Sequence, residues 1–237
     1  MTLRSFLSCC AILLPLAAGN AHAQAPRGET AWLSYRDAYR SMLWFEKYGK
    51  PKQFIQNHFQ AVAREPGATL EGLHLTLVSK TSQLELPLDA LGRTVLPLLK
   101  AAYDDNAEIT LNRKPGQYQF RARASIVGRA DGVYEAADLR AACAQLLAYQ
   151  RYVDPAAERG RACVGVRFSF ARKDVTANVR FKMLDGSASV LAAAEGPAFA
   201  DDAAGVFRIV NYRFADWPDK GFLVTQSPPL AITALYE

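Results

Sequence analysis

Arg121 and Arg123 are the residues whose type and spacing most favour ligand binding. They lie two residues apart on a predicted strand, so both side chains fall on one face. Arg113 and Lys114 lie across the preceding turn and add two cations. We expect this basic ledge to bind an anionic glycan, a lipid headgroup or an acidic partner. The alternative is a solvated face, because alternating arginines also protect a sheet surface or edge.

Cys143 and Cys163 are the two cysteines that remain once the N-terminal segment described below is removed. In an oxidising compartment an even pair predicts a disulfide. The bridge would close a loop of about 21 residues, which chain-entropy theory values at roughly 3 kcal/mol. The alternative is a buried free pair or a reactive thiol, although no histidine lies near either cysteine in the sequence.

Metal and nucleophile chemistry has few candidates. A catalytic zinc usually has three protein ligands, and nothing selects a carboxylate to join His58 and His74. Residues 104–108 and Asp201-Asp202 are acidic, but neither stretch has EF-hand spacing, and turns are the better interpretation. The sequence contains no G-x-S-x-G elbow and no phosphate-binding loop. We therefore predict no catalytic, cofactor-binding or metal-binding residues.

The N-terminus has the order of a Sec-type signal peptide. A short basic start is followed by an apolar run over residues 6–18 and by small residues at Ala21 and Ala23. Cleavage is expected after Ala23, which makes the mature protein periplasmic or secreted. A retained anchor is a weaker alternative, since the apolar run is short of the ~17 to 25 residues that span a bilayer. A lipoprotein modified at Cys9 or Cys10 is weaker because apolar residues 11–18 follow the cysteines, and a buried first helix is weaker because the charge-free run is followed by residues 24–28, Gln-Ala-Pro-Arg-Gly.

Composition indicates a globular protein with a mild basic charge. The chain has 28 Lys and Arg against 23 Asp and Glu, a net charge of +5, and half of its 237 residues are hydrophobic. Cleavage would remove only Arg4, leaving 27 minus 23, or +4. Nucleic-acid binders usually cluster their basic residues, so we expect no nucleic-acid partner. We also expect no transmembrane segment in the mature chain.

Hydrophobic periodicity predicts two helices separated by strands. Residues 34–47 have helical spacing, with Ser34 as a candidate N-cap, and residues 136–151 have it again. Most of residues 70–127 and 163–235 alternate with the period of half-buried strands. Asp185-Gly186 predicts a hairpin turn. Residues 53–64 fit either a helix or a strand, and a strand is weakly favoured.

These patterns predict an α+β fold that is mainly β. We expect two antiparallel, sandwich-like β-rich lobes with an N-terminal amphipathic helix and a connecting helix near 136–151. A single larger α+β domain is the alternative. The expected divisions are a signal peptide at 1–23, a helical segment at 24–66, a β-rich lobe at 67–135, a helix and linker at 136–160, and a second β-rich lobe at 161–237.

The sequence thus favours an exported, non-enzymatic binding or accessory module of the bacterial cell envelope. Its partner would be an envelope protein or an anionic envelope component, and no cofactor is expected. The alternative is an envelope hydrolase with a dispersed active site, for which His58 and His74 are the best anchors.

Overall fold

A computed structural model describes residues 31–64, 68–202 and 205–237. The chain is mostly β, with three antiparallel sheets and few helices, and this agrees with the predicted β-rich α+β class. The expected signal peptide at 1–23 lies outside the described residues. Within them, no helix combines the length and the apolar character needed to cross a membrane.

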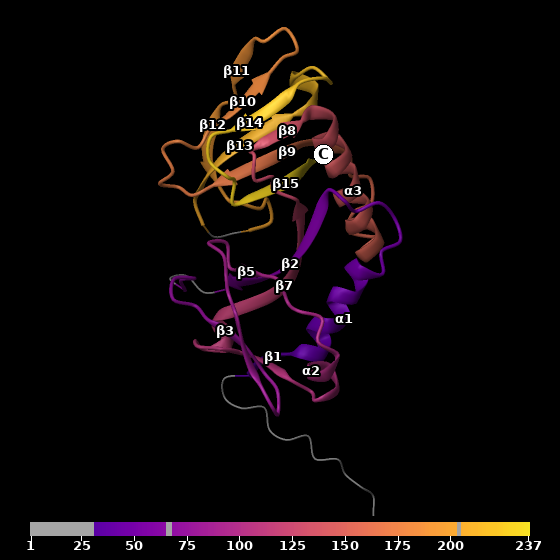
Figure 1. The fold of residues 1–237 in the computed structure, drawn as a ribbon, viewed down its shortest axis with the longest axis vertical. Helices are drawn as coiled ribbons and strands as arrows, with labels where there is room; N and C mark the ends of the chain where they lie inside the picture. The colour runs from indigo at the N-terminus through magenta and orange to yellow at the C-terminus, as the bar shows by residue number, and fades with distance from the viewer. Residues whose placement is uncertain (1–30, 65–67, 203–204) are drawn as a thin grey trace, which may run out of the picture.

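The first four-stranded sheet lies at the N-terminal end of the molecule (Figure 1). Its strand order is β1 (Ala31–Ser34), β6 (Glu108–Leu111), β3 (Leu75–Val78) and β4 (Gln83–Leu86). Helices α1 (Tyr35–Glu46) and α2 (Lys100–Asp104) accompany it. Leu75 and Leu77 of β3 and Ile109 and Leu111 of β6 are buried, whereas the residues between them are partly exposed. This alternation builds a core on one face of the sheet.

A seven-stranded sheet forms the middle of the molecule. Its strand order is β12 (Ala193–Gly196), β13 (Phe207–Arg213), β9 (Cys163–Phe170), β15 (Ala231–Tyr236), β7 (Tyr118–Ile126), β2 (Ile55–Ala63) and β5 (Arg93–Thr94). The ambiguous segment 53–64 is therefore largely strand. Strands β2 and β7 pair along their full nine residues and run between the two ends of the molecule (Figure 1).

The second four-stranded sheet lies at the opposite end. Its order is β11 (Ala188–Val190), β10 (Val179–Lys182), β14 (Phe222–Thr225) and β8 (Val133–Glu135). Strands β10 and β11 form the hairpin predicted around Asp185-Gly186, and Gly186 takes a positive φ of 87°. Two short 3-10 helices, η1 (Pro115–Gln117) and η2 (Phe214–Asp216), precede β7 and follow β13.

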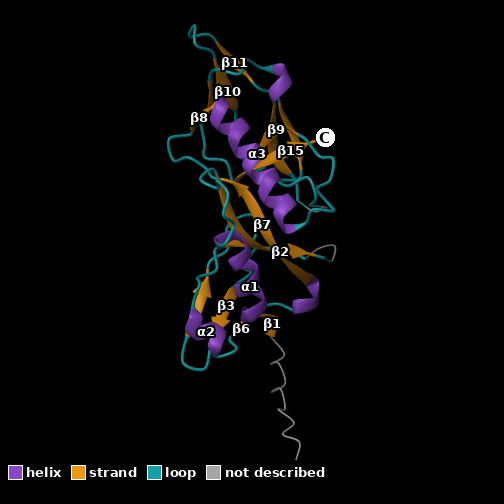
Figure 2. Cartoon of the chain, turned by 90° about the vertical axis from the view of Figure 1, so that its right-hand side faces the viewer, coloured by secondary structure: helices purple, strands orange, loops and turns teal. Residues whose placement is uncertain are grey.

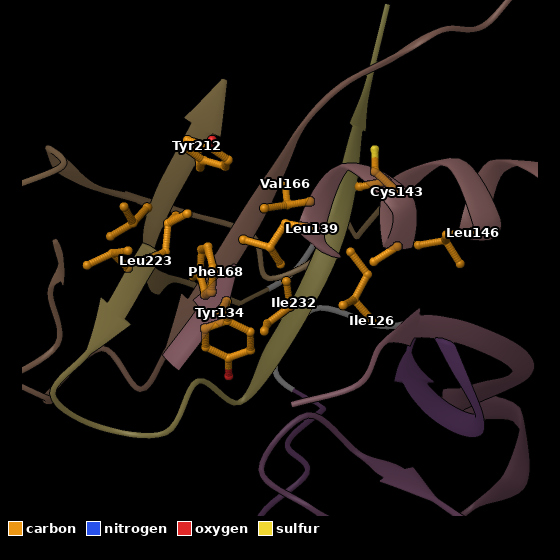
Figure 3. Close-up of a cluster of buried hydrophobic side chains, with 14 of the residues drawn as sticks. Ile126, Tyr134, Leu139, Cys143, Leu146, Val166, Phe168, Tyr212, Leu223 and Ile232 are labelled. Atoms are coloured by element: carbon orange, nitrogen blue, oxygen red, sulfur yellow. The ribbon is translucent and has the colours of Figure 1, made fainter. Parts of the chain in front are cut away.

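Helix α3 (Ala136–Val153) covers the upper part of the seven-stranded sheet (Figure 2). It includes the whole predicted helix 136–151. Figure 3 shows Leu139 of α3 lying against Val166 and Phe168 of β9, and all three side chains are at most 2% exposed. Burial of such side chains is the main force that stabilises the helix on the sheet.

Cys143 and Cys163 lie at disulfide distance, as the sequence predicts, with their Cα atoms 6.0 Å apart. Cys143 is on the buried face of α3, and Cys163 begins β9. The bridge therefore joins the helix to the sheet that it covers.

The start of α1 differs from the capping prediction. Ser34 occupies the N-cap position, but its side chain makes no capping hydrogen bond. Ser34 ends β1, where it is paired with Glu108 of β6. Asp37 in the first turn pairs with Arg40 at 3.2 Å. The helix therefore begins where an extended strand ends, without the expected side-chain cap.

Candidate functional site

A polar face on β2 and β7 carries the candidate site. The strands pair so that His58 lies opposite Arg123 and Gln60 lies opposite Arg121, while Arg93 of β5 lies beside Gln60. Alternate side chains of a strand point to opposite faces. The residues between them, such as Phe59 and Ala61, belong to the core. The two candidate arginines therefore lie side by side on the face away from that core.

Residues 197–202, which we call the strap, cross this face after β12. Arg167 of β9 donates a hydrogen bond to the Pro197 carbonyl at 3.2 Å, and Ser169 donates one to the Ala198 carbonyl at 2.9 Å. The Arg123 guanidinium lies 4.2 Å from the centre of the Phe199 ring, a cation–π contact. The strap is thus held along its length by side chains of the seven-stranded sheet.

Asp201 and Asp202 at the end of the strap meet both candidate arginines. Arg121 pairs with Asp201 at 3.1 Å and also with Asp202, while Arg123 pairs with Asp201 at 2.7 Å and with Asp202 at 2.9 Å. Only 9% of the Asp202 side chain is exposed, against 60% for Asp201. Arg121 and Arg123 of the predicted basic ledge are therefore paired with the chain's own acidic residues, for which the sequence predicted only a turn.

Burial and charge act against each other in this network. Burial raises the pKa of Asp202 above its ordinary value, although the nearby charges of Arg123 and Arg121 work to lower it. Burial also works to raise the pKa of Asp201. The hydrogen bond and charge of Arg123, together with the charge of Arg121, outweigh burial, so the pKa of Asp201 is lowered. Burial, followed by the like charge of Arg123, lowers the pKa of Arg121. Opposed shifts of this kind arise where buried ionisable groups share one cluster.

Gln60 and Arg93 extend the network towards the sheet edge. Gln60 accepts a hydrogen bond from Arg123 at 3.0 Å and donates one to Asp202 at 3.4 Å. Arg93 is 7% exposed, pairs with Asp89 at 2.7 Å and donates to the Leu230 carbonyl at 2.5 Å. Gln60 is 3% exposed, so a buried amide connects the ion pairs to the interior of the protein.

A pocket of about 330 Å³ opens beside Gln60 and Asp202. Its walls are mainly apolar, and they come from the end of β2, the segment that follows it, the turn before β5 and the start of β13. The lining residues are Gln60, Ala61, Val62, Ala63, Ala68, Thr69, Leu70, Glu71, Leu91, Asp202, Gly205 and Phe207. An apolar pocket with a few convergent polar groups is the usual form of a small-molecule site.

Of the remaining candidates, only His58 lies on this polar face, opposite Arg123. Burial, followed by the charge of Arg93, lowers the pKa of His58. His74 is exposed and precedes β3 in a different sheet, and neither histidine lines the pocket. Arg113 and Lys114 are exposed. Among the residues that the structure describes, no group of three or more His, Cys, Asp or Glu side chains could hold a metal ion.

The acidic partners were the part of the site that the sequence interpretation missed. Asp201 lies 80 residues after Arg121, and no local pattern links two such distant segments. The only available signal was complementary charge between an Arg-x-Arg pair and an Asp-Asp pair, and it was ambiguous because Arg159-Gly160-Arg161 and Asp104-Asp105 repeat both patterns. Comparisons of the chain with protein-family models, curated proteins and solved structures gave no match.

Proposed function

We propose that the chain is an exported, non-enzymatic binding or accessory module of the bacterial cell envelope, and that its ligand occupies the pocket beside Gln60 and Asp202. One observation carries this proposal: a pocket of about 330 Å³ has mainly apolar walls and borders the ion-pair network. Apolar walls supply binding free energy, and a small number of polar groups orient the ligand.

The proposed compartment is periplasmic or extracellular. It rests on the signal-like order of residues 1–23 and is supported by the Cys143–Cys163 pair, since disulfides persist in oxidising compartments. N-terminal sequencing of protein recovered from the periplasm or medium should begin at Gln24. A protein recovered only from the cytoplasm with Met1 retained would contradict this part of the proposal.

We also propose that two β-rich lobes share β2 and β7. Two large core clusters support this division. One contains Tyr35, Leu75 and Ile109, and the other contains Phe168 and Val179. Strands from the segments 67–135 and 161–237 are neighbours in the seven-stranded sheet. The proposed lobes would therefore be joined within one sheet, where β7 and β15 pair at Ile126 and Ile232.

The pocket is tested with a neutral apolar dye, phenylnaphthylamine, whose fluorescence rises in an apolar environment. The wild-type protein should bind the dye in a saturable manner. Val62→Trp places a large ring in the pocket wall and should abolish most of the binding. Val78→Trp is the matched control, because Val78 is a partly exposed strand residue of another sheet that does not line the pocket.

The outcome separates a binding pocket from an unspecific apolar surface. Equal dye binding by wild type, Val62→Trp and Val78→Trp would overturn the proposed site. Loss of binding only in Val62→Trp, with an unchanged circular dichroism spectrum, would support it.

A further inference from the structure

We infer that the ligand of this pocket is an anionic amphiphile, and that the strap carboxylate of Asp202 occupies the position of the ligand's anionic group in the described state. This inference rests on the proposed function, because it assigns the apolar part of the ligand to the same pocket. The inference adds that Arg121 and Arg123 form the cationic end of the site. It also adds that the Asp202 carboxylate competes with the ligand for these two arginines.

Three side chains from two strands converge on Asp202. Arg121 and Arg123 both pair with this carboxylate, and the Gln60 amide donates to it at 3.4 Å. Paired guanidinium groups with a neighbouring amide are an arrangement that recognises carboxylate, phosphate or sulfonate oxygens. The strap supplies that anion from within the chain.

The charges of the ion-pair network balance only while the strap is in place, and Arg167 beside the strap adds a further cation outside these pairs. Arg93, Arg121 and Arg123 contribute three positive charges, and Asp89, Asp201 and Asp202 contribute three negative charges. Withdrawal of both strap aspartates leaves three positive charges and one negative charge, a net charge of +2. A face with this charge beside an apolar pocket favours an anion with an apolar tail.

The arginines also have donor capacity that Asp201 and Asp202 leave unused. The Nε atom of Arg121 and the Nη1 atom of Arg93 are buried without a hydrogen-bond partner among the described residues. These two N–H groups are therefore available to the oxygens of an anionic ligand, beside the donors that the strap carboxylates already occupy.

The pocket and the cationic end share a wall. Gln60 and Asp202 line the pocket, and both also contact Arg123. Displacement of Asp201 and Asp202 can leave the anchors at Pro197 and Ala198 in place, because these belong to the first residues of the strap. Once Asp202 has moved, the apolar pocket continues directly to the two guanidinium groups.

The test compares two dyes that differ by a single anionic group. Phenylnaphthylamine is neutral, and anilinonaphthalene sulfonate carries the same ring system with a permanent sulfonate. Wild-type protein should bind the sulfonated dye about tenfold or more tightly, since one hydrogen bond to a charged group commonly contributes a factor of that size. Asp201→Asn with Asp202→Asn removes the internal competitor and should tighten binding of the sulfonated dye further.

A fourfold variant removes the cationic end without leaving a buried unpaired charge. It combines Arg121→Gln and Arg123→Gln with the two Asp→Asn changes, and it should bind both dyes with similar affinity. Arg159→Gln with Arg180→Gln is the control for the loss of two arginines, because both are exposed and lie outside the network. This control should retain the preference for the sulfonated dye.

Two different failures can be distinguished. The first failure is Val62-dependent binding of phenylnaphthylamine without tighter binding of the sulfonated dye, or a fourfold variant that still binds the sulfonated dye more tightly. In either case the anionic-ligand inference is wrong and the pocket proposal stands. If neither dye shows Val62-dependent binding, the proposed function fails and this inference fails with it.

Discussion

Removal of the Cys143–Cys163 bridge should destabilise the protein by about 3 kcal/mol. The two cysteines are separated by 20 positions, so the bridge closes a loop of 21 residues when both ends are counted. Chain entropy gives about 3 kcal/mol for a loop of this length. For a chain of this size each kcal/mol corresponds to roughly 2–4 °C, so Tm should fall by about 6–12 °C.

The assay is thermal unfolding of wild type and of Cys143→Ala with Cys163→Ala, followed by circular dichroism with and without a thiol reductant. Reductant should lower the Tm of the wild type towards that of the double variant and leave the variant itself unchanged. Intact mass should also increase by two hydrogens when the wild type is reduced. A Tm that moves by less than about 2 °C on both removal and reduction would refute the reasoning.

Three further predictions concern the core, one turn and the ion pairs. Phe168→Ala removes a fully buried ring beneath α3 and should lower the free energy of unfolding in urea by about 3–5 kcal/mol. Phe222→Ala, at a partly exposed site, should lower it far less. Equal losses in the two variants would contradict the packing described. Gly92→Ala should destabilise by more than about 1 kcal/mol, because Gly92 has a φ of 72° and an added Cβ would lie 2.6 Å from a backbone oxygen of β2. Gly116→Ala meets no atom within 4 Å and should leave stability nearly unchanged. Asp201 has a lowered pKa, so its stabilising contribution is present above its unfolded pKa and is lost as the pH falls through its folded pKa. Asp201→Asn should therefore be less stable than wild type at pH ~7, and the difference in the free energy of unfolding should shrink as the pH falls through the folded pKa. A difference that grows in acid would contradict this prediction.

The spacing of apolar residues predicted the helices and strands that are long enough to show a repeating pattern. Helix α3 includes all of the predicted range 136–151, and the hairpin at Asp185-Gly186 is present because this dipeptide supports the positive φ that the turn needs. Strand β5, with two residues, and α2, with five, are too short to display a period. Strand β1 was missed because it directly follows the mainly polar sequence of residues 24–30.

The arrangement of strands could not be obtained from the same patterns. Alternation indicates which residues of a strand are buried, but it does not identify the neighbouring strand. Strand β7 pairs with β2, more than 50 residues earlier, and with β15, more than 100 residues later. The site shows the same limit. Arg121 and Arg123 were recognisable from their spacing, whereas their pairing with Asp202 depends on where the strap crosses the sheet.

The position of β15 in the seven-stranded sheet has a consequence for the order of folding. β15 follows every other strand of that sheet in the sequence, yet it lies between β9 and β7. Until Ala231–Tyr236 has been synthesised, β9 has an unpaired edge, and exposed edges invite pairing with other chains. The sheet therefore cannot close progressively from its N-terminal side. A chain built in this way is most prone to aggregation in the time before its last strand inserts.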